Sequence, residues 1–278
     1  MRSGIRYGRT KWLAVFLVGF SVACADVSIL PSLPASLEFA YFPAPAIAIG
    51  DSLRDVDGIA ARARAIVRNQ RGDILSDAPV RFVYADANRD TAVFVDSLTG
   101  YVVSLKALAG SGTTARIAAR VGASLQAIRT VLVTIRPDSV DHAGSKTIDT
   151  LRTTLPDTGS TAATANTSAP LSVTVRHIEG AAGTLVPNWL AKYELLQPAN
   201  PTNDTSANVF LVNDARTVSN IDTTDASGIA SRFVRVRSSK FPAGAAVDSA
   251  VVRVTVFYKG KPVAGSPIRL VVPIIRKP

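Results

Sequence analysis

The stretch Ile229-Ala-Ser-Arg-Phe-Val-Arg-Val-Arg237 alternates apolar with polar side chains, most regularly from Val234 to Arg237. A period of two residues sends successive side chains to opposite faces of an extended chain. The stretch Ala61-Arg-Ala-Arg-Ala-Ile-Val67 has the same period, with arginines on one face and small apolar groups on the other. Both stretches predict half-buried β-strands.

Similar short apolar runs, separated by Gly, Asn, Asp and Pro, fill most of the chain. Before residue 137 we expect strands at Phe39–Phe42, Ile47–Ile49, Ala61–Val67, Pro79–Tyr84, Thr91–Val95, Tyr101–Ala107, Thr114–Val121 and Ile128–Ile135. After residue 170 we expect strands at Leu171–Ile178, Leu190–Leu196, Val209–Val212, Ile229–Arg237, Ser249–Phe257 and Pro267–Val272. No segment has a sustained helical period with caps, although Leu53 and Val56 would suit a short helical turn within Ser52–Asp57. The pattern predicts an all-β fold of β-sandwiches with Greek-key connections.

The composition changes between Pro137 and Pro170 to Ser, Thr, Ala, Asp and Gly, with few large apolar residues. Such a segment buries too little apolar surface to offset the entropy of ordering. We therefore expect a flexible linker over residues 137–169. It would separate one β-sandwich domain at residues 39–136 from a second at residues 170–278.

The first eleven residues contain four basic side chains and no acidic one, and an apolar run from Trp12 to Ala23 follows them. This run is shorter than the roughly 20 residues that a helix needs to cross a bilayer. The order of basic, apolar and small residues is typical of a secretory signal peptide, which we predict over residues 1–23.

Cys24 is the only cysteine in the chain and follows that apolar run directly. The tetrapeptide Ser21-Val-Ala-Cys24 resembles the lipobox of bacterial lipoproteins, in which the cysteine is acylated and becomes the new N-terminus. Ser21 departs from the pattern, because leucine is usual there. The resemblance implies lipidation at Cys24; the alternative is a cysteine that merely ends the apolar run. Residues 24–38 contain two prolines and are predicted to be a tether.

The formal net charge of the chain is +10, and four of the positive charges lie in the predicted leader, which leaves +6. The basic residues are scattered singly and not in blocks of five to eight, so the sequence predicts no nucleic-acid partner. A solvated polar face is expected instead, with weak attraction to anionic envelope polymers. Acylation of Cys24 would leave no thiol, so neither disulfides nor thiolate metal sites are expected.

Candidate catalytic residues are few. His142 and His177 are the only histidines; the first falls in the predicted linker and the second near a strand end, so neither is expected to act as a base beside a nucleophile. Neither zinc-ligand spacing nor a Gly-rich phosphate loop occurs. We predict that the chain is not an enzyme and holds no cofactor.

Three further features suggest binding. Asp214, Asp222 and Asp225 would place carboxylates near one end of the second domain, where Ca²⁺ would find oxygen ligands, but acids are also common in turns. Leu155-Pro-Asp-Thr-Gly159 spells a sortase signal, yet a whole domain follows it. Arg71-Gly-Asp73 spells an integrin-binding tripeptide, but Asn-x-x-Gly-Asp is also the turn expected between two strands, since Gly supplies a positive φ.

The two halves of the chain resemble each other. Asp96-Ser-Leu-Thr-Gly100 and Asp225-Ala-Ser-Gly228 each precede a predicted strand. Together with Val67-Arg-Asn-Gln-Arg-Gly-Asp73 and Ala78-Pro-Val-Arg-Phe-Val83, these segments resemble the bacterial immunoglobulin-like domains of invasin- and intimin-type surface proteins. The resemblance implies two immunoglobulin-like β-sandwich domains that serve as a spacer or an adhesion module and carry no chemistry.

The sequence therefore predicts an exported, lipid-anchored protein of the cell envelope that acts as a structural spacer or adhesion module. Ala25 and Asp26 resemble the start of lipoproteins sent to the outer membrane. Its expected partners are the membrane, through the anchor, and an envelope glycan or protein. The alternative is a glycan- or peptide-binding module that uses loops at one end of a sandwich. Exposed rings at Trp189, Tyr193 and Tyr258 would favour binding, and buried rings would favour the spacer.

Overall fold

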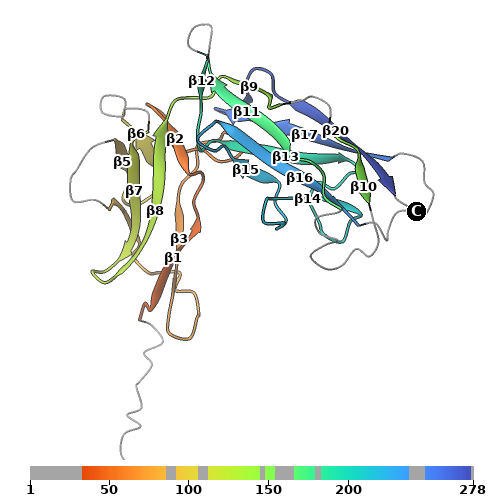
Figure 1. The fold of residues 1–278 in the computed structure, drawn as a ribbon. Coiled ribbons are helices and arrows are strands. Elements are labelled where there is room, and N and C mark those ends of the chain that lie inside the picture. The colour runs from red at the N-terminus through yellow and green to blue at the C-terminus, as the bar shows by residue number, and fades with distance from the viewer. Residues whose placement is uncertain are drawn as a thin grey trace, which may run out of the picture.

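A computed structural model of the chain describes residues 33–85, 92–105, 112–144, 148–153, 166–178, 183–237 and 248–276. The regular elements among these residues are all β-strands, which confirms the predicted all-β class. Within this described part, no helix long and apolar enough to cross a membrane occurs. The strands form two immunoglobulin-like sandwiches that lie side by side, with their strands running in different directions (Figure 1).

The first sandwich contains strands β1 to β8. Their bounds are β1 Ser36–Tyr41, β2 Ala46–Ala48, β3 Arg64–Arg68, β4 Arg81–Tyr84, β5 Val93–Val95, β6 Val102–Ser104, β7 Thr114–Val121 and β8 Leu125–Thr134. One sheet has the order β2-β8-β7-β4, and the pairs β1-β3 and β5-β6 lie opposite it. The core consists of small and aliphatic side chains such as Ile47, Ile117 and Val131, all essentially inaccessible to solvent.

The second sandwich contains strands β9 to β20. Their bounds are β9 Ser139–His142, β10 Leu151–Thr153, β11 Leu171–His177, β12 Thr184–Leu185, β13 Leu190–Gln197, β14 Val209–Val212, β15 Ile221–Thr223, β16 Ile229–Val236, β17 Asp248–Thr255, β18 Phe257–Tyr258, β19 Lys261–Pro262 and β20 Ile268–Arg276. One sheet has the order β10-β20-β17-β13-β15, and the other β12-β11-β16-β14 with β9 also paired to β11. The short pair β18-β19 stands apart from both sheets.

Both sandwiches begin in the same way. In the first, β1 pairs antiparallel with β3, and β2 pairs parallel with the last strand, β8. In the second, β9 pairs antiparallel with β11, and β10 pairs parallel with the last strand, β20. The first strand of each domain is thus split between the two sheets, and it closes both of them. This shared plan gives a structural basis to the similarity between the two halves of the sequence.

The structure corrects the predicted linker and the predicted tether. Strands β9 and β10 lie inside residues 137–169 and belong to the second sandwich, where Val140 and Leu151 are buried in its core. Strand β1 begins at Ser36, inside the predicted tether of residues 24–38. These short strands escape a pattern search because most of their stability comes from partners far away in the sequence.

One turn recurs between strands. At Asp55, Asn69 and Asp225 a side-chain oxygen accepts hydrogen bonds from the backbone N–H groups two and four residues later. The backbone N–H of the fourth residue of each turn then bonds to the carbonyl of the first residue, with a glycine in this position. The segment Ser52–Asp57 therefore leads into such a turn and not into the helical turn that its sequence suggested. The turn at Asn69 contains Arg71-Gly-Asp73 and confirms the structural explanation of that tripeptide.

Candidate functional site at the domain junction

A connected set of polar contacts lies where the two sandwiches meet. The first domain contributes the loop of residues 51–60, which follows β2. The second contributes residues 188–192 at the start of β13 and residues 257–260 around β18. Hydrogen bonds, an ion pair and ring contacts cross between these segments, so the junction is an interface and not a free hinge.

Asp51 and Arg54 form the centre of this junction. Arg54 donates from its Nε and one terminal nitrogen to the two carboxylate oxygens of Asp51, at 2.8 and 2.7 Å. Its other terminal nitrogen donates to the Gly58 carbonyl at 3.0 Å, which ties the ion pair to the turn. Only 7% of Asp51 is exposed. A bidentate pair of this kind is strong and directional.

Tyr258 of the second domain joins this pair from across the junction. Its hydroxyl hydrogen-bonds with Asp51, and the Arg54 guanidinium lies 5.8 Å from the centre of its ring. Burial, and then the charge of Asp51, raises the pKa of Tyr258 to about 12. Burial also tends to raise the pKa of Asp51, but the hydrogen bonds from Arg54 and from the Ser52 amide outweigh it, so that pKa is lowered. Asp51 is therefore ionised and Tyr258 neutral at ordinary pH.

Backbone and salt-bridge contacts reinforce the junction on the same side. The Gly260 amide donates to the Gly58 carbonyl at 2.9 Å. A Cβ on Gly58 would lie 2.9 Å from the Gly260 nitrogen and 3.0 Å from the Phe257 Cβ, so the close approach requires glycine. Lys192 of β13 donates to an Asp57 carboxylate oxygen at 2.7 Å.

Apolar side chains also cross the junction. Ala48 of β2 belongs to the core cluster of the second sandwich, and Leu190 of β13 packs against that of the first. The hollow between them, beside Arg54 and Trp189, measures about 10 Å³, which is room for one water molecule at most. The two cores thus share one packed boundary.

The three aromatic residues that would distinguish a binding groove from a spacer lie inside the fold. Trp189 and Tyr193 are buried and Tyr258 is partly buried. The Trp189 indole donates to the Phe257 carbonyl at 3.2 Å and meets the Tyr258 ring edge to face at 6.1 Å. None of these rings is part of an open aromatic groove. Trp189 and Tyr258 pack at the junction, and Tyr193 lies in the core of the second sandwich.

The two histidines lie on neighbouring strands of the second sandwich. His142 lies on β9 and not in a linker, and neither of its ring nitrogens has a hydrogen-bond partner. The Nδ1 of His177 lies against a carboxylate oxygen of Asp138, which also pairs with Arg136 at 3.1 Å. These contacts join β11 to the segment before β9, and we assign no reaction to them.

The three aspartates considered for calcium are engaged separately. Asp222 pairs with the buried Arg232 at 2.7 Å and accepts the Ser231 amide at 2.6 Å. Asp225 organises its own turn, and Asp214 is exposed. No group of three His, Cys, Asp or Glu side chains that could hold a metal ion occurs in the described residues. These aspartates therefore do not fit a calcium site.

Three features of the sequence lie outside the described residues, namely the predicted signal peptide of residues 1–23, Cys24 and the string Leu155–Gly159. Lipidation at Cys24 stays a prediction.

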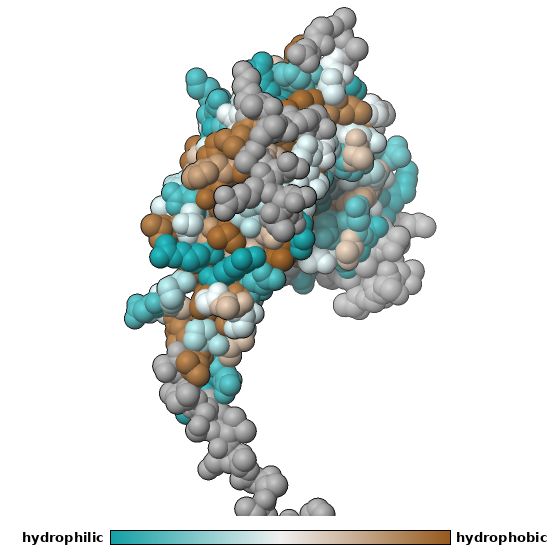
Figure 2. All heavy atoms as spheres, turned by 90° about the vertical axis from the view of Figure 1, so that its left-hand side faces the viewer, coloured by the Kyte–Doolittle hydropathy of each residue, from teal (hydrophilic) through white to brown (hydrophobic). Residues whose placement is uncertain are grey.

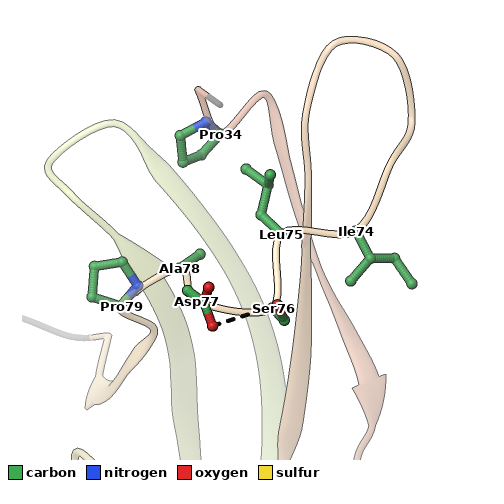
Figure 3. A pocket seen from close by; sticks show the side chains of 7 residues that line it. All are labelled: Pro34, Ile74, Leu75, Ser76, Asp77, Ala78 and Pro79. Carbon is green, nitrogen blue, oxygen red and sulfur yellow. Dashed lines mark hydrogen bonds between the residues drawn. The ribbon is translucent and has the colours of Figure 1, made fainter. Parts of the chain in front are cut away.

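Among the described residues, the surface of the first sandwich carries a hollow and an apolar patch. The hollow, about 420 Å³, is lined mainly by apolar residues of the segment 74–79 together with Pro34 (Figure 3). It lacks the converging polar groups that mark a small-molecule site. The patch consists of Phe94, Leu98, Tyr101 and Leu105, which are exposed on and beside the β5-β6 pair. Figure 2 shows brown hydrophobic side chains gathered on this side of the molecule.

No protein-family model matches the chain, and no curated protein matches it. Among solved structures, the adhesin InvE of Yersinia pseudotuberculosis aligns with 86% of this chain and 58% of its own, at 14% identity and a TM-score of 0.32. The protocadherin gammaB4 extracellular domain aligns with 86% of this chain and 32% of its own, at 13% identity and a TM-score of 0.28. Domains 5–6 of the S-layer protein SbsC align over 88% and 99%, at 15% identity and a TM-score of 0.28. This chain thus spans about a third of the protocadherin chain, and likenesses at this level carry no conclusion about function.

The sequence did not reveal the junction. Tyr258 lies about two hundred residues after Asp51 and Arg54, and each of the three looks like an ordinary loop residue in its own segment. The one available signal was the Asp-x-x-Gly turn at residues 55–58, which marked a tight loop but not its partner.

Proposed function

We propose that this protein is an exported, lipid-anchored component of the cell envelope whose two immunoglobulin-like domains act as a rigid spacer or adhesion module. The observation that carries the spacer is the junction, where Tyr258 of the second domain meets the buried Asp51–Arg54 pair of the first and the two cores share residues. A structural element that must keep a distance needs such a joint, because domains on a free linker move independently. No reaction is assigned.

The anchor rests on the sequence around Cys24. One acyl chain binds a membrane only marginally, whereas two or more hold it firmly, so the lipidated cysteine would be the functional chemistry of the chain. The test is metabolic labelling with a palmitate analogue, comparing the wild type with Cys24→Ala. Label only in the wild type supports the anchor, and equal labelling of both would exclude it. The outer membrane, suggested by Ala25 and Asp26, is tested by fractionation of the labelled cells.

The rigid spacer is tested by the distance between the domains. Spin labels at Gln126→Cys and Arg269→Cys, both exposed, would be placed in the full chain with Cys24→Ser. We expect one narrow distance distribution. Gly58→Val, which forces a side chain against the Gly260 nitrogen, should broaden the distribution while both domains stay folded. An already broad distribution in the parent protein would contradict the spacer.

The alternative is a module that binds a glycan or peptide through loops at one end of a sandwich. Burial of Trp189 and Tyr193 speaks against a groove built from those rings. The exposed Leu98 and Tyr101, in and after the turn between β5 and β6, are the observation that keeps this alternative open. The double variant Leu98→Ser, Tyr101→Ser tests this alternative by cell-surface adhesion. Adhesion should be unchanged if the protein is a spacer, and it should be abolished if the protein binds a glycan or peptide through this loop.

A further inference from the structure

The outer face of the sheet β2-β8-β7-β4 carries an arginine group that the sequence, with its singly scattered basic residues, did not predict. Arg81 of β4 and Arg120 of β7 are directly opposite each other in the antiparallel ladder. Arg116 lies four residues before Arg120 on the same face of β7, about 13 Å away along the strand. All three side chains are exposed.

The four strands of this sheet contribute positive charge to the face and no negative charge. None of the four strands contains an aspartate or a glutamate. Within the described residues, neither Arg81 nor Arg120 makes an ion pair. Like charges directly opposite each other in a sheet are destabilising, so the pairing of Arg81 with Arg120 weakens the folded domain. A stability cost at an exposed position is a reason to look for a ligand that offsets it.

Among the described residues, no other element covers this face. The main contacts of β7 and β8 are with their sheet neighbours and with β1, and β1 packs on the inner side through Leu37 and Phe39. Between the arginines lie Ala118, which is buried, and its ladder partners Val83 and Ile128, which are partly exposed. Gln126 and Thr130 lie opposite Arg120 and Arg116 and are exposed. The large exposed apolar side chains of the first domain lie on other strands and loops. The result is a flat, positively charged surface in which arginine and hydrogen-bonding side chains surround partly exposed aliphatic ones.

We propose that this outer face binds an acidic polysaccharide through Arg81, Arg116 and Arg120. Planar guanidinium groups bind carboxylate or phosphate oxygens in pairs. The flat sheet suits an extended polymer, with Gln126 and Thr130 placed to bond to its hydroxyls. A lipid surface is less well matched, because interfacial binding combines basic residues with large apolar side chains that insert, and the apolar residues of this face, Val83, Ile128 and Leu132, are only partly exposed. The inference goes beyond the spacer and does not depend on the anchor.

The test measures binding of the full chain, with Cys24→Ser so that no acyl chain contributes, to immobilised polygalacturonate. Neutral dextran and vesicles containing phosphatidylglycerol are the comparison surfaces. We expect binding to the acidic polymer that weakens steeply between about 0.05 and about 0.5 M sodium chloride, and none to dextran. Equal binding to dextran, or binding to vesicles alone, would overturn the proposal.

Two variants locate the surface. Arg81→Gln with Arg120→Gln should weaken binding about tenfold or more, while Arg62→Gln with Arg71→Gln removes the same charge from exposed sites elsewhere and should change it less than about twofold. Arg120→Glu places an opposite charge across from Arg81, so it should abolish binding while the melting temperature stays the same or rises. Equal losses in the Gln pair and its control, or unchanged binding of Arg120→Glu, would overturn the proposal.

Discussion

Gly100 illustrates how a single residue limits what this fold tolerates. It ends the turn before β6 with φ of 74°, and a Cβ there would lie 2.6 Å from the Ala63 carbonyl oxygen. That carbonyl belongs to the residue whose amide bonds to the Gly100 carbonyl at 3.0 Å. Gly228 is the equivalent residue of the second domain: its carbonyl accepts the Val175 amide, and a Cβ on it would lie 2.9 Å from the Val175 carbonyl oxygen. Gly72 has φ of 87° but open space around it.

Alanine at these positions should separate backbone strain from steric overlap. Gly72→Ala adds only the cost of a left-handed backbone, so the free energy of unfolding should fall by about 1 kcal/mol. Gly100→Ala adds the overlap with Ala63 and should lower it by about 3 kcal/mol or more. Urea unfolding of both variants measures the difference. If both variants lose the same free energy of unfolding, the backbone around Ala63 moves aside at no energetic cost and the prediction is wrong.

Tyr258 should make the protein sensitive to alkali. Its pKa is raised to about 12, so the folded state keeps the proton when the unfolded state has lost it. The contribution is complete below the ordinary pKa of about 10 and is lost as pH rises through the folded value. Thermal melting should therefore show a smaller fall in stability from about pH 10 to about pH 12 in Tyr258→Phe than in the wild type. Tyr101→Phe, which removes an exposed hydroxyl, is the control and should follow the wild type.

Among the strands, β9 and β10 show how little of a short element is visible in its own residues. Each has at most four residues, and both lie in a segment rich in small polar residues. β9 is held by a ladder to β11, and β10 by a parallel ladder to β20, more than a hundred residues later. Their stability comes from closing the two sheets and from burying Val140 and Leu151.

Truncation of Leu151 tests whether β10 belongs to the core. Leu151→Ala should lower the free energy of unfolding of the second domain by about 2 to 4 kcal/mol, because it removes a side chain that is only 6% exposed. Arg152→Ala, the exposed neighbour on the same strand, should change it by about 0.5 kcal/mol or less. Denaturant unfolding of both variants measures these changes in the free energy of unfolding. A linker residue at 151 would tolerate both changes alike.

In the whole molecule, the junction couples the two sandwiches. The contacts of Tyr258 with Asp51 and Arg54, the ion pair between Lys192 and Asp57, and the shared core contacts are all lost if either domain unfolds. Each domain therefore stabilises the other. Coupling of this kind makes two domains behave as one cooperative unit.

Removal of Arg54 should uncouple them. Arg54→Ala leaves Asp51 as an unpaired buried carboxylate, which costs about 3 kcal/mol at the junction. Calorimetry should show one unfolding transition in the wild type and two in the variant. Arg62→Ala, an exposed residue of the same domain, should keep one transition. Two transitions in the wild type would mean that the domains are energetically independent.

The sequence by itself determined the all-β class, most of the longer strands and the Asn-x-x-Gly turn at residues 69–72. These features depend on local chemistry: period-two alternation, and the freedom of glycine to adopt a positive φ. The same local information placed a signal peptide and a lipidated cysteine at the N-terminus, which stay predictions. It failed where Leu53 and Val56 suggested a helical turn, because bridges from Ser52 to Val103 and from Arg54 to Ala60 hold that loop extended.

Only the tertiary structure decided which residues meet. Asp51 and Tyr258 face each other because the parallel pairing of β2 with β8 and the path of β18 bring their loops together. Arg81 and Arg120 become neighbours only through the register of β4 against β7. Trp189 and Tyr193 looked like candidates for a binding groove and are buried instead. Contacts between distant segments depend on sheet register and domain packing, which no single stretch of sequence encodes.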